Sequence, residues 1–221
     1  MSNNTIDIAK LPVNNQGLTI FSFTDNQNPI SQIIRGVLKE ESVILTHEDP
    51  IEDAYDSIKR EDGLASVASD RSNPAVVAKD DVTAESFSEA NRAAMRRLPE
   101  MVILGIIDGE DKVAAAIDLA LQGVKVIATV KSKDIGAIIP DILSFLPTEL
   151  RASKACELIS NTNMLVTKKA TEAGIDEEFV AMQHLVFDKA LKTKLLASIE
   201  DKGYNPETLS QEIESMVKEV A

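Results

Sequence analysis

Short apolar runs that alternate with longer amphipathic stretches constrain the fold of this chain more than any other feature. The apolar runs are bounded by polar residues and predict buried strands: LTIFSF at 18–23, SVILTH at 42–47, MVILGII at 101–107 and VKVIATV at 124–130. Helical patterns fill the intervals at 30–40, 85–99 and 110–123. Strands that alternate with helices in this way predict an α/β fold, in which a mainly parallel sheet is covered by helices.

The second half of the sequence is richer in helical patterns than the first. We expect a helix over 133–147 with a break at Pro140, a helix over 148–160, an extended segment at 163–169, and a helical tail from about residue 188. Residues 53–82 are rich in Asp, Ser and Lys and have weak periodicity, so we expect a mobile loop there. These patterns suggest a core over residues 1–170 and a mostly helical C-terminal appendage over 171–221.

The junction GLTIFSFTDNQNPISQII at 17–34 is where a phosphate-binding loop would stand in such a fold, because a strand runs through a polar loop into a helix. A phosphate-binding loop needs glycines, a lysine for the terminal phosphates and a Ser/Thr hydroxyl for Mg²⁺. Here the chain has Asn28, Pro29 and Ile30 at that point. Pro29 has no charge and no N–H to donate, although it suits the first turn of a helix. The helix is therefore expected to form without phosphate chemistry.

Composition limits the partners and the compartment. The net charge of −13 argues against nucleic acid, whose phosphates favour clustered Lys and Arg. No apolar run reaches the roughly 18 residues of a membrane-spanning helix, and MSNNTIDIAK lacks the features of a signal peptide. The single cysteine excludes an internal disulfide. We therefore expect a cytoplasmic protein without direct membrane insertion, held at the inner membrane, if at all, through another protein.

Collinear strings resemble the hexameric motor ATPases of type IV pili and type II/IV secretion. They are VILTHEDPIED at 43–53, AMRRLPEMVILG at 94–105, LALQGVKVIATV at 119–130, FLPTEL at 145–150 and HLVFDKALKTKLL at 184–196, the last looking most like the conjugation and Dot/Icm branch. The resemblance covers roughly residues 17–200 and implies a RecA-like fold. The family also carries a separate N-terminal domain, and only a short segment precedes Gly17. The resemblance therefore extends to the RecA-like half alone, and we do not expect this chain to form a free hexamer by itself.

Set on the family's pattern, the catalytic positions of this chain carry other residues. The phosphate-binding loop (Walker A) is occupied by Phe23, Asn26, Asn28, Pro29 and Ile30. In the Walker B segment, Ile106 follows Gly105 where the family has a glutamate, and Asp108 replaces an arginine. In the His box, Val124 follows Gly123 and Lys131 stands at the second histidine position. The resemblance therefore implies a nucleotide site that has lost its chemistry, with no cofactor and no metal.

Two remnants of the family's pattern survive. Glu48, Asp49 and Glu52 keep the acidic box; they could hold Mg²⁺ or water, but without a phosphate-binding loop we favour a role in capping a strand-end turn. Arg92 and Arg96 match arginines that the family uses near its nucleotide and subunit boundary, so we expect them at an interface.

These observations favour an inactive homologue of a secretion, pilus or conjugation motor, acting as a structural or regulatory subunit. Its expected partner is an active motor ATPase or another protein of that machinery, in a homo- or hetero-oligomer. Two alternatives stay open from the sequence. One is an ATPase with an unconventional nucleotide site, and the other is an unrelated α/β interaction module.

Overall fold

A six-stranded sheet in the order β2-β3-β4-β1-β5-β6 forms the centre of the molecule. The computed structural model describes residues 16–24, 33, 44–46, 92, 95, 96, 99, 101–168 and 182–220. The strands are β1 (Gly17–Phe23), β2 (Ile44–Thr46), β3 (Met101–Ile106), β4 (Lys125–Lys131), β5 (Thr162–Lys168) and β6 (Met182–Val186). All neighbouring strands pair in parallel except β5 and β6, which are antiparallel. The mainly parallel sheet predicted from the sequence is confirmed.

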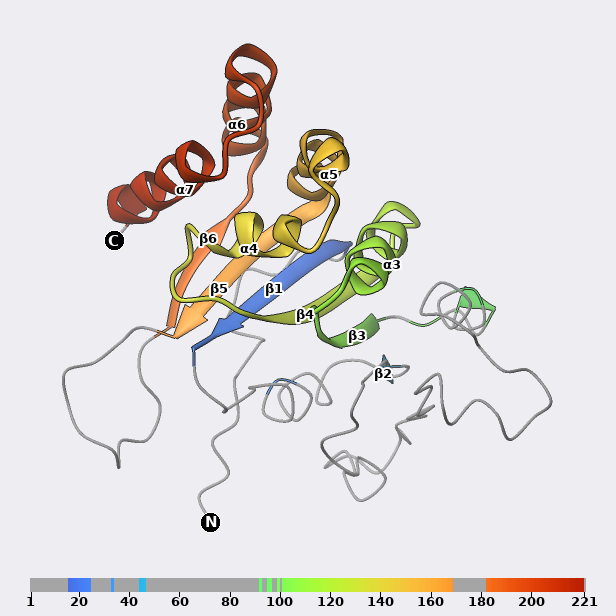
Figure 1. Cartoon of the computed structure of the whole chain (residues 1–221). Coiled ribbons are helices and arrows are strands. Elements are labelled where there is room, and N and C mark those ends of the chain that lie inside the picture. The colour runs from blue at the N-terminus through green and yellow to red at the C-terminus, as the bar shows by residue number, and fades with distance from the viewer. Residues whose placement is uncertain are drawn as a thin grey trace.

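The described helices lie together over one face of this sheet (Figure 1). They are α3 (Glu110–Leu121), α4 (Ile138–Ser144), α5 (Thr148–Asn161), α6 (Lys189–Lys202) and α7 (Pro206–Val220). Acidic residues occupy the first turn of α3, where they favour the helix dipole, and Gly123 follows the helix at a φ of 81°, which glycine adopts without strain. None of the described helices is both long and apolar enough to cross a membrane.

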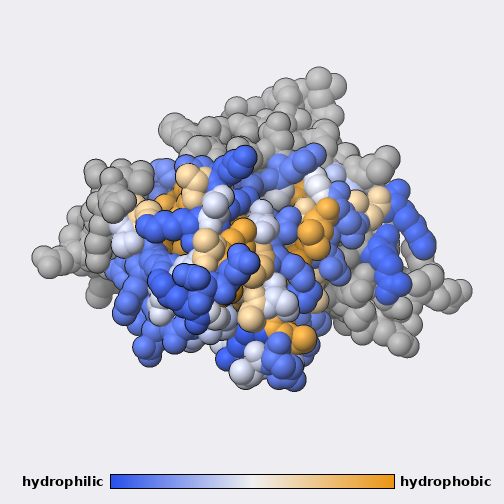
Figure 2. All heavy atoms as spheres, turned by 90° about the horizontal axis from the view of Figure 1, so that it is seen from above, coloured by the Kyte–Doolittle hydropathy of each residue, from blue (hydrophilic) through white to orange (hydrophobic). Residues whose placement is uncertain are grey.

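Alternation along β1 explains how the sheet divides the interior. Leu18 and Ile20 belong to the hydrophobic cluster that α3 to α7 cover. The next residue, Phe21, is also buried but does not belong to that cluster. Side chains of a strand alternate between faces, so both faces of β1 are buried. The helical face seen from above is mostly hydrophilic, and its apolar groups are small and separated (Figure 2). The core on this side is therefore well covered.

The structure corrects the expectation for 133–147. The helix α4 does not break at Pro140; it begins at Ile138 and contains Pro140 in its first turn. A backbone N–H in the first turn has no partner within the helix, so proline costs little there. The proline therefore marks the start of a short helix instead of an interruption in a longer one.

The C-terminal region joins the same sheet and core. The strand β6 was not predicted from the sequence, yet it pairs with β5 along Met164 to Lys168. Leu195 of α6 and Ile213 of α7 are fully buried in the cluster that also contains Leu18. The boundary expected at 170 and 171 falls outside the described residues, and the division into two units stays a prediction. The helical tail itself is confirmed.

Other predictions also fall outside the part of the chain that the structure describes. These are the loop at 53–82, the helix at 30–40 apart from the buried Ile33, and most of the helix at 85–99. Within that last segment, Arg92 and Met95 are helical and Arg96 lies in a turn.

Candidate functional site

The carboxyl ends of β1, β3 and β4 meet at one edge of the sheet, where a ligand of an open α/β fold would bind. This edge brings together Phe23 of β1, Ile106 of β3 and Lys131 of β4, which the sequence had singled out separately. The other loop and acidic-box residues lie outside the described residues: Asn26, Asn28, Pro29, Ile30, Glu48, Asp49 and Glu52.

Phe23 closes the end of β1. The residue is 8% exposed, and its carbonyl accepts a hydrogen bond from the Ser132 N–H at 3.0 Å. Phe23 also pairs with Lys131 in the parallel register between β1 and β4. A buried aromatic therefore ends β1, at the position where the resemblance in sequence implies the first glycine of a phosphate-binding loop.

The end of β3 is shaped by a bulge around Gly105. The register between β3 and β4 shifts between Ile103 and Ile106, and Gly105 has a φ of 29°. The buried Thr129 of β4 stabilises the bulge through two hydrogen bonds, one on each side of Ile106. Its hydroxyl donates to the Gly105 carbonyl at 3.1 Å, and its carbonyl accepts from the Ile107 N–H at 2.8 Å. Bulges of this kind often change the direction of a side chain next to a functional site. The residue that follows Gly105 in this bulge is the half-buried Ile106. An apolar side chain at this position cannot hold a proton or orient a water.

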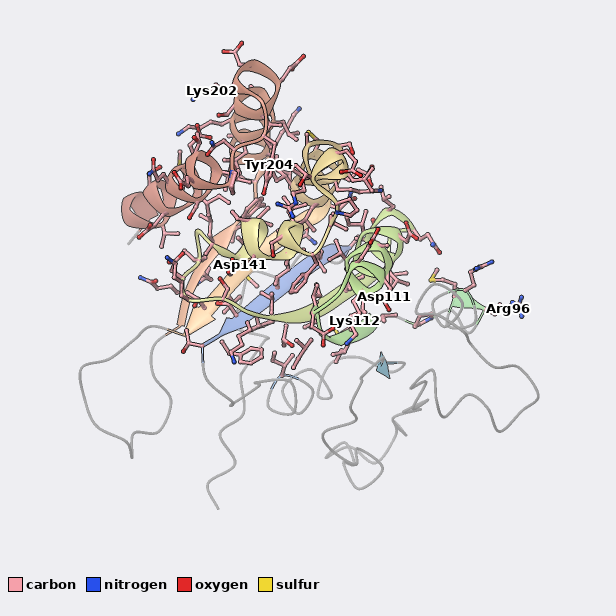
Figure 3. The ribbon with its side chains drawn as sticks, in the orientation of Figure 1. Arg96, Asp111, Lys112, Asp141, Lys202 and Tyr204 are labelled. Carbon is pink, nitrogen blue, oxygen red and sulfur yellow. The ribbon has the colours of Figure 1, made fainter. Side chains whose placement is uncertain are left out.

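Asp108, just beyond β3, is paired with a lysine that sequence reasoning missed. The Lys112 Nζ lies 2.8 Å from Asp108 Oδ1, and the lysine side chain is 8% exposed while that of Asp108 is 55% exposed. Both residues stand at the start of α3 (Figure 3 labels Lys112). A neighbouring cation thus partly offsets the negative charge of Asp108. The spacing of four residues was the available signal.

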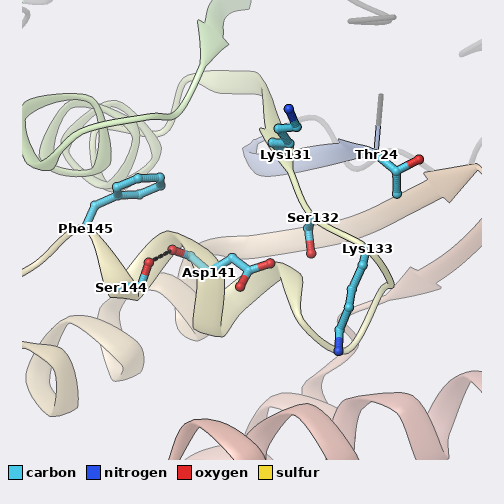
Figure 4. Close-up of a pocket in the computed structure, with 7 residues that line it drawn as sticks. All are labelled: Thr24, Lys131, Ser132, Lys133, Asp141, Ser144 and Phe145. Carbon is cyan, nitrogen blue, oxygen red and sulfur yellow. Dashed lines mark hydrogen bonds between the residues drawn. The ribbon is translucent and has the colours of Figure 1, made fainter. Parts of the chain in front are cut away.

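A cavity of about 450 Å³ opens between the ends of β1 and β4 and the helix α4. Its lining is formed by Thr24, Lys131, Ser132, Lys133, Asp141, Ser144 and Phe145 (Figure 4). Only Lys131 among these residues was predicted as part of a site. The sequence KSK at 131–133 was a further signal, since it places two cations directly after a strand.

Local hydrogen bonds fix the cavity wall. Asp134 accepts from the Ala137 N–H at 2.8 Å through its side chain and from the Ser132 hydroxyl at 3.2 Å through its carbonyl. The Ser144 hydroxyl donates to the Asp141 carbonyl at 2.6 Å. The ammonium groups of Lys131 and Lys133 and the hydroxyl of Thr24 supply donors that suit a carboxylate or a phosphate, while Asp141 adds one negative charge. Among the described residues, no group of His, Cys, Asp and Glu is arranged to hold a metal ion.

The two His-box positions lie at opposite ends of β4. Gly123 and Val124 precede the strand, and Lys131 ends it. A seven-residue strand spans roughly 20 Å at about 3.3 Å per residue. Val124 is buried near the amino edge, where its carbonyl accepts from the Gly17 N–H at 3.1 Å. The structure therefore brings Lys131 to the cavity and keeps Gly123 and Val124 away from it.

The model of the family described as type II/IV secretion system protein matches residues 30–168, which is more than half of the chain. The chain belongs to this family. The alternative of an unrelated α/β module is therefore wrong. No curated protein matches the sequence.

Solved structures of secretion-family ATPases share the fold. The ATPase DotB of Legionella pneumophila is 19% identical with a TM-score of 0.73, and the match covers 97% of this chain and 57% of that one. DotB of Yersinia pseudotuberculosis is 22% identical with a TM-score of 0.73, with 98% and 56% covered. The pilus retraction motor PilT with bound ADP is 18% identical with a TM-score of 0.64, with 90% and 58% covered. These likenesses confirm the RecA-like fold, and this chain spans a little over half the length of those proteins.

The two arginines expected at an interface lie on the surface. Arg92 and Arg96 are both exposed, and Figure 3 shows Arg96 at the outer edge of the molecule. Neither residue lines the cavity at the end of β4. Their expected place at an interface stays a prediction.

Proposed function

We propose that this member of the type II/IV secretion family is catalytically inactive and acts as a structural or regulatory subunit through protein contacts. The observation that carries the proposal is the end of β3, where the half-buried Ile106 occupies the position of the family's glutamate. The nearby carboxylate of Asp108 is engaged by Lys112 at 2.8 Å. Neither residue is suited to activate a water for attack on a phosphate.

The end of β1 supports the same proposal. Phosphate-binding loops work by pointing successive backbone N–H groups at the ligand. Here the buried Phe23 is followed in the sequence by Pro29 at the lysine position. The proposed partner is an active motor ATPase or another protein of a secretion or pilus machinery. We place this chain in the cytoplasm, where its partner could hold it at the inner membrane. Purification of the tagged chain from its host is expected to bring down an intact motor ATPase.

Calorimetry with Mg-ATP tests the loss of nucleotide binding. We expect a dissociation constant weaker than about 1 mM, which corresponds to less than about 4 kcal/mol of binding free energy. The reason is that each charge-assisted hydrogen bond to phosphate contributes roughly 1.5–3 kcal/mol, and this chain lacks the lysine and hydroxyl that supply several of them. A dissociation constant of tens of micromolar would contradict the proposal.

The cavity favours a second candidate, an ATPase with an unconventional nucleotide site. Lys131 and Lys133 line the same cavity as Thr24, so a cation at the end of β4 or just beyond it could take the place of the missing loop lysine. The double variant Lys131→Met, Lys133→Met separates the two candidates. If calorimetry detects ATP binding and this variant abolishes it, the second candidate replaces the first.

A further inference from the structure

The C-terminal hairpin formed by α6 and α7 packs directly on the helical wall of the cavity. In Figure 1, α7 lies beside α4, and α6 stands beside α5. Leu209, Ile213 and Val217 follow one face of α7 and are buried in the common core cluster. Lys192 of α6 donates to the Ser160 carbonyl of α5 at 2.8 Å, and burial lowers the pKa of this lysine. The hairpin is thus anchored along both of its helices.

The hairpin lies close against the wall at Gly136. This residue lies in the turn that leads from the cavity residues Lys131 to Lys133 into α4. A Cβ atom added to Gly136 would lie 2.6 Å from the Ser210 carbonyl oxygen and 3.2 Å from the Glu214 Cβ. The first distance is too short for any side chain and involves backbone, which cannot easily move away. Glycine at this position therefore allows the turn to rest against α7.

Tyr204 is a second anchor of the hairpin, since its side chain packs against the common core cluster. This half-buried tyrosine lies between α6 and α7; burial raises the pKa of its phenol, with smaller effects of the charges on Arg151 and Asp141 (Figure 3). Arg151 in turn donates to the Leu146 carbonyl at 2.9 Å and to the Ser144 carbonyl at 3.0 Å, which caps the end of α4. Arg151 of α5 therefore fixes the end of α4, the helix whose Asp141 and Ser144 line the cavity.

The wall depends on these contacts because its helix is short. Helix α4 has seven residues, and isolated helices shorter than about 12–15 residues are marginal in water. Its stability must come from packing, with the sheet on one side and the hairpin on the other. We propose that the α6–α7 hairpin is a strap that sets the shape of the cavity, so that displacement of the hairpin loosens residues 134–146 and frees the cavity wall. The strap does not depend on whether the chain hydrolyses ATP.

Hydrogen–deuterium exchange on the full chain tests the strap with one variant in the cavity wall and one in the hairpin. Gly136→Ala forces the wall and α7 apart, and Tyr204→Ala removes a side chain that packs the hairpin onto the core. We expect each variant to speed amide exchange in residues 134–146 roughly tenfold or more, because overpacking or lost packing weakens the structure that protects these amides, with α3 unchanged. Coupling of this kind is reciprocal, so α7 should exchange faster in the Gly136→Ala variant as well.

Matched controls keep the test specific. Gly109→Ala adds a methyl group that would meet only the Asp111 carboxylate at 3.0 Å, the end of a flexible side chain, so exchange in 134–146 should stay as in the wild type. Tyr204→Phe keeps the ring and should behave likewise. Faster exchange in the hairpin alone after Tyr204→Ala would overturn the proposal. An equal rise in α3 would also overturn it, because it would indicate general destabilisation. Tyr204→Ala decides the question if Gly136→Ala fails to fold.

Discussion

Replacing Phe187 by alanine is expected to destabilise the whole domain by about 3–5 kcal/mol, the range found for buried phenylalanines. Phe187 is 2% exposed, sits between β6 and α6, and donates its N–H to the Asn163 carbonyl at 2.8 Å. Its ring belongs to the cluster shared by the sheet and all described helices. Because a domain of this size loses roughly 2–4 °C per kcal/mol, calorimetry should show the melting temperature falling by about 6–20 °C.

The same experiment tests the division at residues 170 and 171. If β6, α6 and α7 share one cooperative core with the sheet, the variant should melt in a single transition. An early transition confined to the tail, with the main transition unmoved, would establish the C-terminal region as a separate appendage. Phe145→Ala is the matched control, since Phe145 is 38% exposed, and its loss should cost less than about 1 kcal/mol.

Much of the fold was predictable because the interior strands are continuous apolar runs. β1, β3 and β4 are buried on both faces, and such strands give an unbroken apolar signal instead of an alternation. The end of α3 was predictable from Gly123, whose φ of 81° few other residues adopt without cost. These signals are local, so one sequence suffices to find them.

The errors arose where the structure depends on distant partners. β6 is the strand of an antiparallel edge, and its half-exposed pattern, with His184 exposed and Leu185 buried, is weak in isolation. Pro140 was expected to break a helix, but the turn built by Asp134 delays the helix start, so the proline falls in the first turn. Neither the strand pairing nor the turn is visible in local periodicity.

The candidate site shows the same limit. The sequence identified the ends of β1, β3 and β4 one at a time, and the parallel register that sets Phe23 beside Lys131 assembled them. The cavity needs α4 to fold back over these ends, which adds Asp141 and Ser144 from a helix that carried no motif. The buried partner of Asp108 was also missed, although Lys112 lies one helical turn away.

The double variant Arg92→Ala, Arg96→Ala is expected to weaken association with an intact motor ATPase about tenfold or more while leaving the melting temperature nearly unchanged. Both arginines are exposed, so the fold gains little from them, since exposed ion pairs contribute only about 0–1 kcal/mol. At an interface, the planar guanidinium can hold a carboxylate or a phosphate of the partner in two hydrogen bonds, and truncation of such anchors costs more than about 1 kcal/mol each. The measurement is co-purification with the motor subunit alongside thermal unfolding.

Two controls separate the interface from simple charge and from the fold. Lys189→Ala with Lys194→Ala removes two exposed cations from α6. This control changes the net charge by the same amount as the arginine variant but at another surface, so association should stay intact. Arg92→Lys with Arg96→Lys keeps the charge but loses the planar fork, so an intermediate loss of association is expected. If the alanine double variant instead lowers the melting temperature by many degrees and co-purifies as well as the wild type, the arginines serve the fold of this chain. In that case the interface with the motor must lie on another surface.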